Sequence, residues 1–492
     1  MTDLDRRSFL RSSATVAAGG ALLGGPFAGF AASGAAAATP TTTPLVDVPD
    51  LRDNVVRLAL PAGFRYRSFH DTTTPVTLGD GTPLPGRHDG MAAFDGGRHR
   101  VTLVRNHEVN SFGAAFGASG PVYDENAPGG TTTIVTTHEG EVQDSFTSLS
   151  GTQMNCSGGP MPWGAWITCE ETVNGPDVFD DFTRGTLPPD TYVQNAQLRK
   201  PHGFVFEVPA HGRASGLPIR HAGRFAHESV ALDPEEGALY LTEDNFAFPS
   251  GFYRYVPPQH PRKVGRLLDG GRLFMLKVAG TDNADLSLGQ PAHASYRVEW
   301  VEIEEPFYDG GVPGPGGLPT KTNDELLTFV SDQGLAQGAA KFSRLEGSIY
   351  DKGVVYFCST QGGATPAGDP GPSAGGFGAG RGQIWAYDTR AQRLHLVYES
   401  PSREVLDFPD NVTVSDRGTL VVCEDNDQGN FLRGLSRNGR IGDLALNRMA
   451  GRENDEFAGS TFSPDGTTLF VNIQASRGLT FAIWGPWHKA GF

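Results

Sequence analysis

One short pattern recurs along most of the chain and restricts its fold more than any other feature. Each unit has an acidic residue, a short apolar stretch, a turn containing glycine, and a second apolar stretch that ends in polar residues. In one unit Glu228 begins the first stretch, the turn falls at 233–237, and the second stretch ends at Asn245. Apolar and β-branched stretches around an Asp- and Gly-containing turn predict a β-hairpin. Comparable units begin at Glu346, Asp410 and Glu456.

Fainter copies of the pattern precede these units, at 91–108 and 163–171, which brings the total to about six. Hairpins repeated in this way predict the blades of a β-propeller. The Gly- and Pro-rich stretches 309–319 and 362–382 interrupt the pattern, and strand-like sequence resumes beyond each, so we interpret them as loop insertions. The sequence therefore predicts an all-β fold, a single large six-bladed β-propeller with long loop insertions over residues 39–492. The best helical candidate is short, at 323–329.

Composition excludes several classes of protein. The chain has 40 Lys and Arg against 56 Asp and Glu, a formal net charge of −16, whereas a nucleic-acid-binding protein needs a basic surface. The 65 glycines and 35 prolines favour a turn-rich β protein, and the 30 phenylalanines argue against disorder. No serine-hydrolase elbow, Walker loop or dinucleotide fingerprint occurs in a suitable context, which argues against serine hydrolases, nucleotide hydrolases and nicotinamide enzymes. Because of the acidic net charge, we expect no nucleic-acid partner.

The first residues have the features of a twin-arginine signal peptide. Arg6 and Arg7 precede a mildly apolar stretch at 15–32, and small residues at 36–38 provide a cleavage site. The apolar stretch is too rich in glycine and alanine for a membrane anchor, and no later segment approaches the length of a membrane span. We predict a cleaved leader at 1–38, the twin-arginine export machinery as a partner, and a mature chain that is secreted or held in the cell envelope or periplasm.

Acidic residues at one phase of the repeat predict a metal site. Equivalent positions of propeller blades converge on the central channel, and carboxylates that close repel one another unless cations neutralise them. The alternative is that some of them cap turns or face solvent. The candidates that open strands are Glu228, Glu346, Asp410 and Glu456, and those that close strands are Glu108, Glu171, Glu243 and Glu424.

Cys156 is a further candidate ligand, because it precedes a Ser-Gly-Gly sequence and lies 15 residues before Glu171. A chain folded before export has little need of disulfides, so we interpret Cys169, Cys358 and Cys423 as buried, inert thiols. His107 and His227 each precede a glutamate but lack the helical spacing of zinc ligands, and they are weaker candidates.

Arg344 and Glu346 are two residues apart, so in an extended backbone they point to the same side. A carboxylate can then hold a metal while the guanidinium binds an anion such as phosphate. The alternative is an ordinary surface ion pair.

Together these motifs resemble the PhoX-type alkaline phosphatases, which are exported by the twin-arginine pathway and depend on calcium and iron. The matching sequences cover most of the mature chain in order: Asn106-His107-Glu108, Asn155-Cys156 with Cys169-Glu170-Glu171, Gly223-Arg224-Phe225-x-His227-Glu228, Lys341-x-x-Arg344-x-Glu346, Pro409-Asp410-Asn411, Phe462-Ser463-Pro464-Asp465-Gly466 and Gly485-Pro486-Trp487. One departure is Leu345, which stands where the family usually has proline.

The resemblance implies a calcium and iron cluster in the propeller channel and hydrolysis of small phosphate monoesters. It implies Arg344 as the catalytic, phosphate-binding arginine. The implied metal ligands are Cys156, Glu171, Glu228 and Glu346, with Asp410 and Glu108 as weaker candidates. A second phosphate-binding cation is expected at Lys341 or Arg381.

Two other functions fit the same sequence. A calcium-dependent propeller hydrolase of the lactonase or phytase type would share the acidic channel but would need neither Cys156 nor iron. A non-enzymatic, exported binding propeller would use calcium only to hold its fold.

Overall fold

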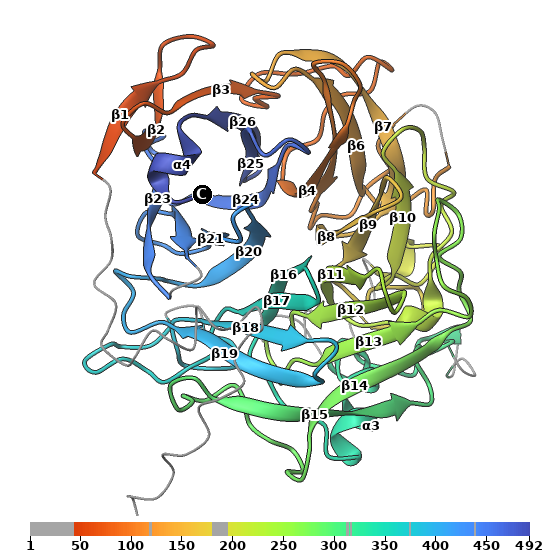
Figure 1. The fold of residues 1–492 in the computed structure, drawn as a ribbon. Helices are drawn as coiled ribbons and strands as arrows, with labels where there is room; N and C mark the ends of the chain where they lie inside the picture. Colours follow the sequence, from red (N-terminus) through yellow and green to blue (C-terminus); the bar gives the residue numbers. More distant parts are fainter. Residues whose placement is uncertain are drawn as a thin grey trace, which may run out of the picture.

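The computed structural model describes residues 44–117, 121–179, 195–310, 314, 317–372, 375–436 and 439–492. The predicted leader at 1–38 lies outside these residues. Almost all the regular secondary structure of the described residues is antiparallel β-sheet (Figure 1), so the predicted all-β fold and the β-propeller architecture are confirmed.

Six strands among the described residues form the innermost ring. They are β4 (His88–Asp95), β8 (Asn155–Met161), β11 (His227–Asp233), β16 (Leu345–Asp351), β20 (Pro409–Val414) and β24 (Glu456–Phe462). Each contacts the next in this order, and β24 contacts β4, so the ring closes around a central axis (Figure 1). The first residues of all these strands therefore converge at the same end of one channel.

Each innermost strand begins an antiparallel sheet that extends outward. After β4 come β5 (Val101–His107), β6 (Gly129–Thr136) and β7 (Val142–Thr152), and after β8 come β9 (Ala165–Glu170) and β10 (Val205–Pro209). β11 is followed by β12 (Ala238–Glu243), β13 (Phe252–Val256), β14 (Arg272–Val278) and β15 (Ser295–Ile303). β16 is followed by β17 (Val354–Ser359), β18 (Gln383–Asp388) and β19 (Arg393–Glu399), and β19 pairs with β15.

The first strands of the chain complete the last two sheets. β20 is followed by β21 (Leu420–Glu424), β22 (Phe431–Leu435) and β23 (Ile441–Asn447), to which β2 (Val56–Pro61) and β1 (Leu45–Pro49) are added. β24 is followed by β25 (Thr468–Gln474) and β26 (Leu479–Trp484), and β3 (Arg65–Phe69) forms the outer edge. Main-chain hydrogen bonds between the two ends of the chain therefore close the ring.

Helices in the described residues are short and lie outside the sheets. They are the 3-10 turns η3 (Asn195–Gln197) and η4 (Arg220–Ala222) and the α-helices α2 (Asn323–Leu327), α3 (Phe329–Ala336) and α4 (Trp487–Ala490). The helix expected at 323–329 corresponds to α2 and the first residue of α3, and Thr322 and Glu325 form a capping box at its start. None of the helices in the described part of the chain has the length and apolar character needed to cross a lipid bilayer.

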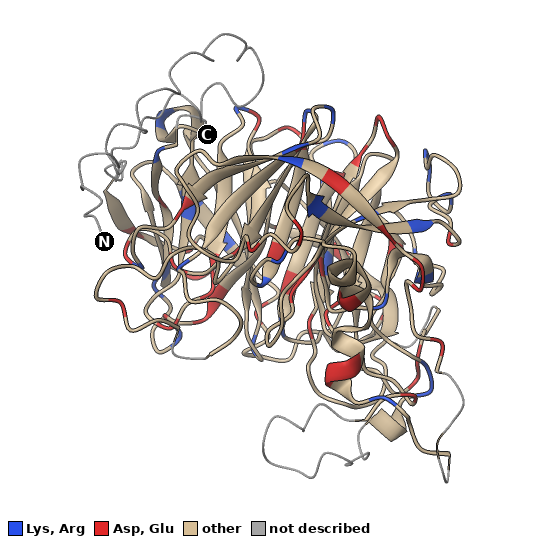
Figure 2. Ribbon diagram, turned by 90° about the horizontal axis from the view of Figure 1, so that it is seen from below, with Lys and Arg blue, Asp and Glu red and all other residues tan. Residues whose placement is uncertain are grey.

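Apolar side chains fill the spaces between neighbouring sheets. One cluster joins the two sheets that contain β20 and β24, and includes Tyr66, Leu432, Phe457 and Phe481. Charged residues are interspersed in the view from below, where Lys and Arg lie among Asp and Glu (Figure 2). The stability of the fold thus comes from apolar burial between sheets, which leaves the channel end free to carry polar groups.

All the innermost strands share a shift in register of the kind that a β-bulge makes. In β11 the shift lies between His227 and Val230, and in β16 it lies between Leu345 and Ser348. β4, β8, β20 and β24 have the same shift. A bulge leaves residues outside the ladder and re-aims their side chains. The residues at the first bulged position are Asp89, Cys156, Glu228, Glu346, Asp410 and Gly459.

Candidate active site

A cavity of about 470 Å³ lies where the first residues of the innermost strands converge. Most of its lining consists of carboxylates, from Asp89, Glu108, Glu171, Glu228, Asp244, Glu346, Asp410, Asp425, Asp455 and Glu456. The other lining residues are Arg87, Arg344, Cys156, Asn454, Gln474 and Ala475. Every strand of the ring therefore contributes to the cavity through itself or its adjoining turns.

The first bulged position provides a cavity side chain in all but one of the ring strands. Asp89, Cys156, Glu228, Glu346 and Asp410 hold this position and line the cavity. In β24 the equivalent residue is Gly459, whose φ is +61°. A Cβ atom there would lie 2.3 Å from the carbonyl oxygen of Asp89, so this strand approaches β4 too closely to carry a side chain.

A second set of carboxylates follows the strand after the innermost one in four of the six units. Glu108, Glu171, Asp244 and Asp425 come directly after β5, β9, β12 and β21, and all four line the cavity. Glu243 and Glu424, which the sequence pattern also indicates, each lie one residue earlier and do not line it. Because successive residues of a strand point to opposite sides, they are turned away from the channel.

Those two glutamates bind main-chain and side-chain donors instead. Glu243 accepts hydrogen bonds from the Gly251 amide and the Tyr253 hydroxyl, both at 2.8 Å. Glu424 accepts from the Asp407 amide at 3.0 Å and from Nε of Arg433 at 2.8 Å. Their role is to fix strand ends within the sheet.

Two groups of side chains within the cavity have the geometry to hold cations. Cys156, Glu171 and Glu228 form one group, and Glu228, Glu346 and Asp410 form the other; within each group one ligand atom per residue lies within 4.8 Å of the others. Glu228 belongs to both. The structure thus brings the four residues favoured from the sequence, together with Asp410, into one continuous cluster.

The electrostatics of this cluster favour a bound cation. Burial and the carboxylates of Asp410 and Asp89 raise the pKa of Glu228 well above its ordinary value. Burial and the carboxylates of Asp244 and Glu228 do the same to the pKa of Glu171. A metal ion would neutralise the repulsion and replace the lost hydration, so the carboxylates present fit calcium, which prefers oxygen ligands.

The pKa values of Asp410 and Cys156 are also raised. Burial and the Asp425 carboxylate raise the pKa of Asp410 to about 7. Burial and the carboxylates of Glu228 and Glu171 raise the pKa of the Cys156 thiol, which donates to the carbonyl oxygen of His227 at 3.2 Å. A buried thiol becomes a thiolate when it binds a metal, and sulfur with carboxylate oxygen is a donor set that suits iron.

Arg344 adjoins this cluster from the residue before β16. Its Nε lies 3.1 Å from Oδ1 of Asp244, and its Nη2 donates to Oδ2 of Asp244 at 2.8 Å and to Oε1 of Glu346 at 3.0 Å. The expectation that Arg344 and Glu346 face the same side agrees with this hydrogen bond and with the shared cavity. Two carboxylates therefore orient a guanidinium beside the candidate metal ligands.

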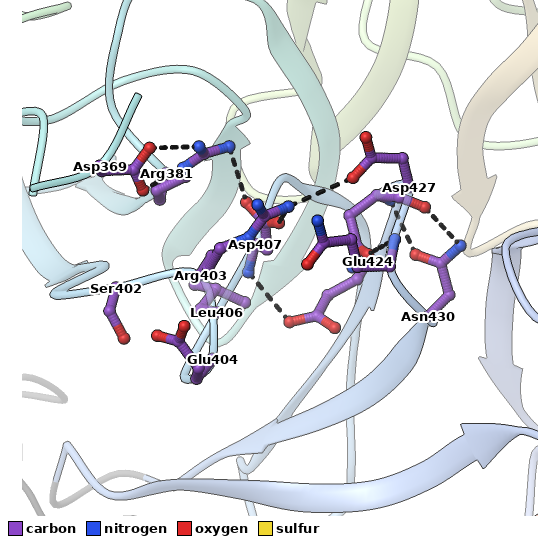
Figure 3. A network of polar contacts seen from close by, with 12 residues as sticks. Asp369, Arg381, Ser402, Arg403, Glu404, Leu406, Asp407, Glu424, Asp427 and Asn430 are labelled. Atoms are coloured by element: carbon purple, nitrogen blue, oxygen red, sulfur yellow. Dashed lines mark hydrogen bonds and ion pairs between the residues drawn. The ribbon is translucent and has the colours of Figure 1, made fainter. Parts of the chain in front are cut away.

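The structure does not bring the two other expected cations to the cavity. The main chain of Lys341 pairs with the loop at 284–286, and its side chain does not line the cavity. Arg381 is buried in a separate network of ion pairs, where its Nε donates to Asp369 at 2.7 Å and its Nη1 to Asp407 at 3.3 Å (Figure 3). Both aspartates already neutralise it.

The weaker sequence candidates have structural partners. His107 contacts the carbonyl oxygen of Gly86 at 2.9 Å and the hydroxyl of Thr132 at 3.0 Å, and His227 contacts the carbonyl oxygen of Gly223 at 3.0 Å. Neither histidine lines the cavity. All four cysteines of the sequence are buried and free of disulfides.

The sequence pattern does not single out several of the cavity residues. The most informative are Arg87 and Asp89, whose Arg-x-Asp spacing repeats the Arg-x-Glu spacing of Arg344 and Glu346. Comparing the residues before each acidic strand opening would have found them. The sequence pattern does not distinguish Asp244 and Asp425, because the glutamate preceding each one carries the same charge.

Fold and cavity together define a β-propeller with a carboxylate-lined site that could bind metals at one end of its channel. The sequence profile described as alkaline phosphatase PhoX matches residues 42–476, so the chain belongs to the PhoX alkaline phosphatase family. The prediction of an alkaline-phosphatase-like phosphoric monoester hydrolase is confirmed by this membership. No curated protein sequence matches the chain significantly.

Solved structures include a similar fold. The chain is similar to PhoX of Pseudomonas fluorescens in complex with vanadate, a transition state analogue, with 18% identity, a TM-score of 0.61, and coverage of 91% of this chain and 98% of that one. A gluconolactonase of Xanthomonas campestris matches with 14% identity and a TM-score of 0.37, covering 91% of this chain and 100% of that one.

Proposed function

We propose that this protein hydrolyses small phosphate monoesters at the acidic cavity, using calcium and iron. The observation that carries the proposal is the contact between Arg344 and Glu346, because it joins an anion-binding guanidinium to the two groups of candidate metal ligands that share Glu228. The vanadate held by Pseudomonas fluorescens PhoX, a family member, supports a phosphoryl-transfer site.

Each residue of the cluster has a part in this proposal. Glu228, Glu346 and Asp410 would hold calcium through carboxylate oxygens, and Cys156 with Glu171 would hold iron. When bound, the metals neutralise the charge on the phosphoryl oxygens and so favour cleavage of the ester bond.

Arg344 binds and orients the phosphoryl group in this scheme. The carboxylates of Asp244 and Glu346 hold its Nε and Nη2, so the plane of the guanidinium is fixed before the substrate enters. Within the described residues, Nη1 of Arg344 forms no hydrogen bond. A fixed donor of this kind stabilises negative charge without reorganisation during the reaction.

Replacement of Arg344 tests the proposal. Arg344→Ala is expected to lower the turnover of a chromogenic phosphate ester by about 100-fold or more, while calcium and iron stay bound. Arg390→Ala provides the control, because the exposed Arg390 side chain pairs with Glu235 on the outside. Turnover by Arg344→Ala at the rate of the unaltered protein would contradict the role of this residue.

The metals are tested separately by elemental analysis of protein purified without chelators. Calcium with iron is the expected result, and Cys156→Ser should lose iron. Calcium alone would favour a lactonase- or phytase-like hydrolase. Absence of both metals would favour a binding propeller.

We also propose that the chain is exported through the twin-arginine pathway, on the basis of Arg6, Arg7 and the small residues at 36–38. Sequencing the N-terminus of the mature protein should find it near residue 39. Replacing both arginines by lysine should retain the precursor inside the cell.

A further inference from the structure

Arg87 and Arg344 occupy the same position in their sheets. Arg87 directly precedes β4 and Arg344 directly precedes β16, each two residues before a carboxylate at the first bulged position. Both have a left-handed backbone, with φ of +49° and +39°. Met154 and Phe408 hold the equivalent positions before β8 and β20, also at positive φ. The bulged ring thus offers the same place several times, and two of these places carry a guanidinium.

The two arginines lie on opposite sides of the channel. Contacts between innermost strands run in the order β4, β8, β11, β16, β20, β24 and back to β4. β16 is therefore the third strand from β4 in either direction around the ring. Both side chains line the same cavity, and they come from opposite sides of the ring.

Their surroundings differ in two respects that matter for a substrate. Arg344 donates to Glu346, a member of a candidate metal group. Arg87 is bound to Glu108, through its Nε to the carbonyl oxygen at 2.8 Å and through its Nη2 to the carboxylate, and Glu108 belongs to neither metal group. The Arg87 side chain is also 32% exposed, against 16% for Arg344. Arg87 therefore lies outside the candidate metal cluster and nearer to solvent.

Arg87 can still take a ligand. Among the described residues, its Nη1 has no hydrogen-bonding partner, while Glu108 fixes the other two nitrogens. A guanidinium held in this way presents free donors to carboxylate or phosphate oxygens. Arg87 also offsets the repulsion that the carboxylates of Glu108, Glu456 and Asp89 exert on an anion at this side of the cavity.

We propose that Arg87 binds a second anionic group of the substrate, carried by the alcohol that leaves. The preferred substrates would be phosphate monoesters whose leaving group bears a carboxylate or a further phosphate. Arg344 holds the phosphoryl group beside the candidate metal ligands, and Arg87 holds the other anion across the channel. This proposal rests on the proposed phosphatase function and names its class of substrate.

Binding of two matched phosphonates tests the proposal without turnover. Phosphonohexanoate carries a phosphonate and a carboxylate, whereas hexylphosphonate has a methyl group in place of the carboxylate. Calorimetric titration of the metal-loaded protein should show phosphonohexanoate binding about tenfold more tightly, a typical gain for a charge-assisted hydrogen bond. In Arg87→Gln this preference should fall to about one. Arg87→Lys, which keeps the charge, should retain part of it.

The control is Arg390→Gln, which removes an exposed arginine outside the cavity and should keep the full preference. Equal affinity of the unaltered protein for both phosphonates would overturn the proposal, as would an undiminished preference in Arg87→Gln. An equal loss of both affinities in that variant would also overturn it, because Arg87 would then serve the phosphoryl group or the fold.

Hydrolysis of p-nitrophenyl phosphate separates this proposal from the function on which it rests. Hydrolysis together with equal binding of the two phosphonates would leave the phosphatase function standing and remove the second anion site. Preference for phosphonohexanoate without any hydrolysis would support the anion site and contradict the phosphatase function.

Discussion

The two ends of the innermost strands differ in chemistry although they belong to the same strands. The first residues of β11 and β16 provide Glu228 and Glu346 to the acidic cavity of about 470 Å³. The last residues of these strands provide Leu232 and Tyr350 to a second pocket of about 520 Å³, lined mainly by apolar side chains. The difference begins at the bulge, which turns unpaired side chains toward the channel at one end, whereas the regular ladder beyond it buries apolar residues.

This comparison separates a functional end from a stabilising end. Carboxylates at the acidic end have raised pKa values because burial and mutual repulsion disfavour their charge, so without metal they oppose folding. At the other end, buried apolar side chains such as Leu232 and Met161 favour folding. Substitutions at the two ends should therefore have different consequences, and the following experiments measure them.

The largest effect is expected at Glu228, the residue shared by both candidate metal groups. Glu228→Gln should lower phosphate-ester turnover by about 1,000-fold or more, because a neutral amide is a poor ligand at both groups. Elemental analysis should find less metal in the same preparation. Glu235→Gln, in the exposed turn after the same strand, is the matched control and should change neither quantity. Full metal content in Glu228→Gln would contradict the assignment of this residue.

At the apolar end, Leu232→Ala should affect stability rather than metal binding. Leu232 is buried in the core cluster between neighbouring sheets. Its truncation should lower the free energy of unfolding by about 2–5 kcal/mol, as for other buried leucines. Denaturant unfolding measures the loss, and elemental analysis of the folded variant should find the metal content unchanged. If the variant loses metal while its stability is unchanged, the separation between the two ends is wrong.

A smaller effect is expected at Gly459, where the ring strand without a cavity side chain approaches β4. Gly459→Ala should lower the free energy of unfolding by about 1–3 kcal/mol, because it adds a clash with the Asp89 carbonyl to the strain of a positive φ. Gly451→Ala is the control, since its φ is +72° and its Cβ would meet no atom within 4 Å. Equal losses in the two variants would mean that the close approach contributes nothing.

The smallest effect concerns pH. Asp410 has a pKa raised to about 7, so a proton must leave this group when calcium binds its carboxylate. As the pH increases toward 7, the apparent calcium affinity should therefore rise by up to about tenfold per pH unit, and above pH 7 it should level off. Calorimetric titrations from about pH 5 to about pH 8 measure this dependence. In Asp410→Asn the rise should be shallower, and an unchanged slope would assign the proton to another group.

The same raised pKa determines the direction in which the stability of the metal-free protein changes with pH. Between the ordinary value of 3.8 and about 7, the folded chain holds more protons on Asp410 than the unfolded chain does. The contribution of this group to stability should therefore fall as pH rises through that range.

Much of the candidate site could be predicted from the sequence, because the repeat and the position of its acidic residues are local features. Cys156, Glu171, Glu228, Glu346 and Asp410 each stand at a fixed place within a hairpin, and the ring brings them to one cavity. Local patterns cannot decide which of two consecutive acidic residues faces the channel. That choice depends on the register of each strand, and it separated Asp244 and Asp425 from the glutamates before them.

Long-range pairing explains what else could not be predicted. Arg381 resembles a free cation in the sequence, but Asp369 and Asp407 neutralise it through contacts that only the folded loop makes. No local signal indicates that β3 pairs with β26, since the two strands come from opposite ends of the chain. Arg87 could be predicted from the sequence, because it stands two residues before an acidic residue, as Arg344 does.

The most direct test of the central claim is the phosphate-ester turnover of one preparation before chelation, after chelation, and after calcium and iron are restored. We predict that turnover disappears with the metals and returns with them, because the clustered carboxylates and Cys156 are placed to bind the cations that the reaction requires. Turnover that persists unchanged in the fully stripped protein would contradict it.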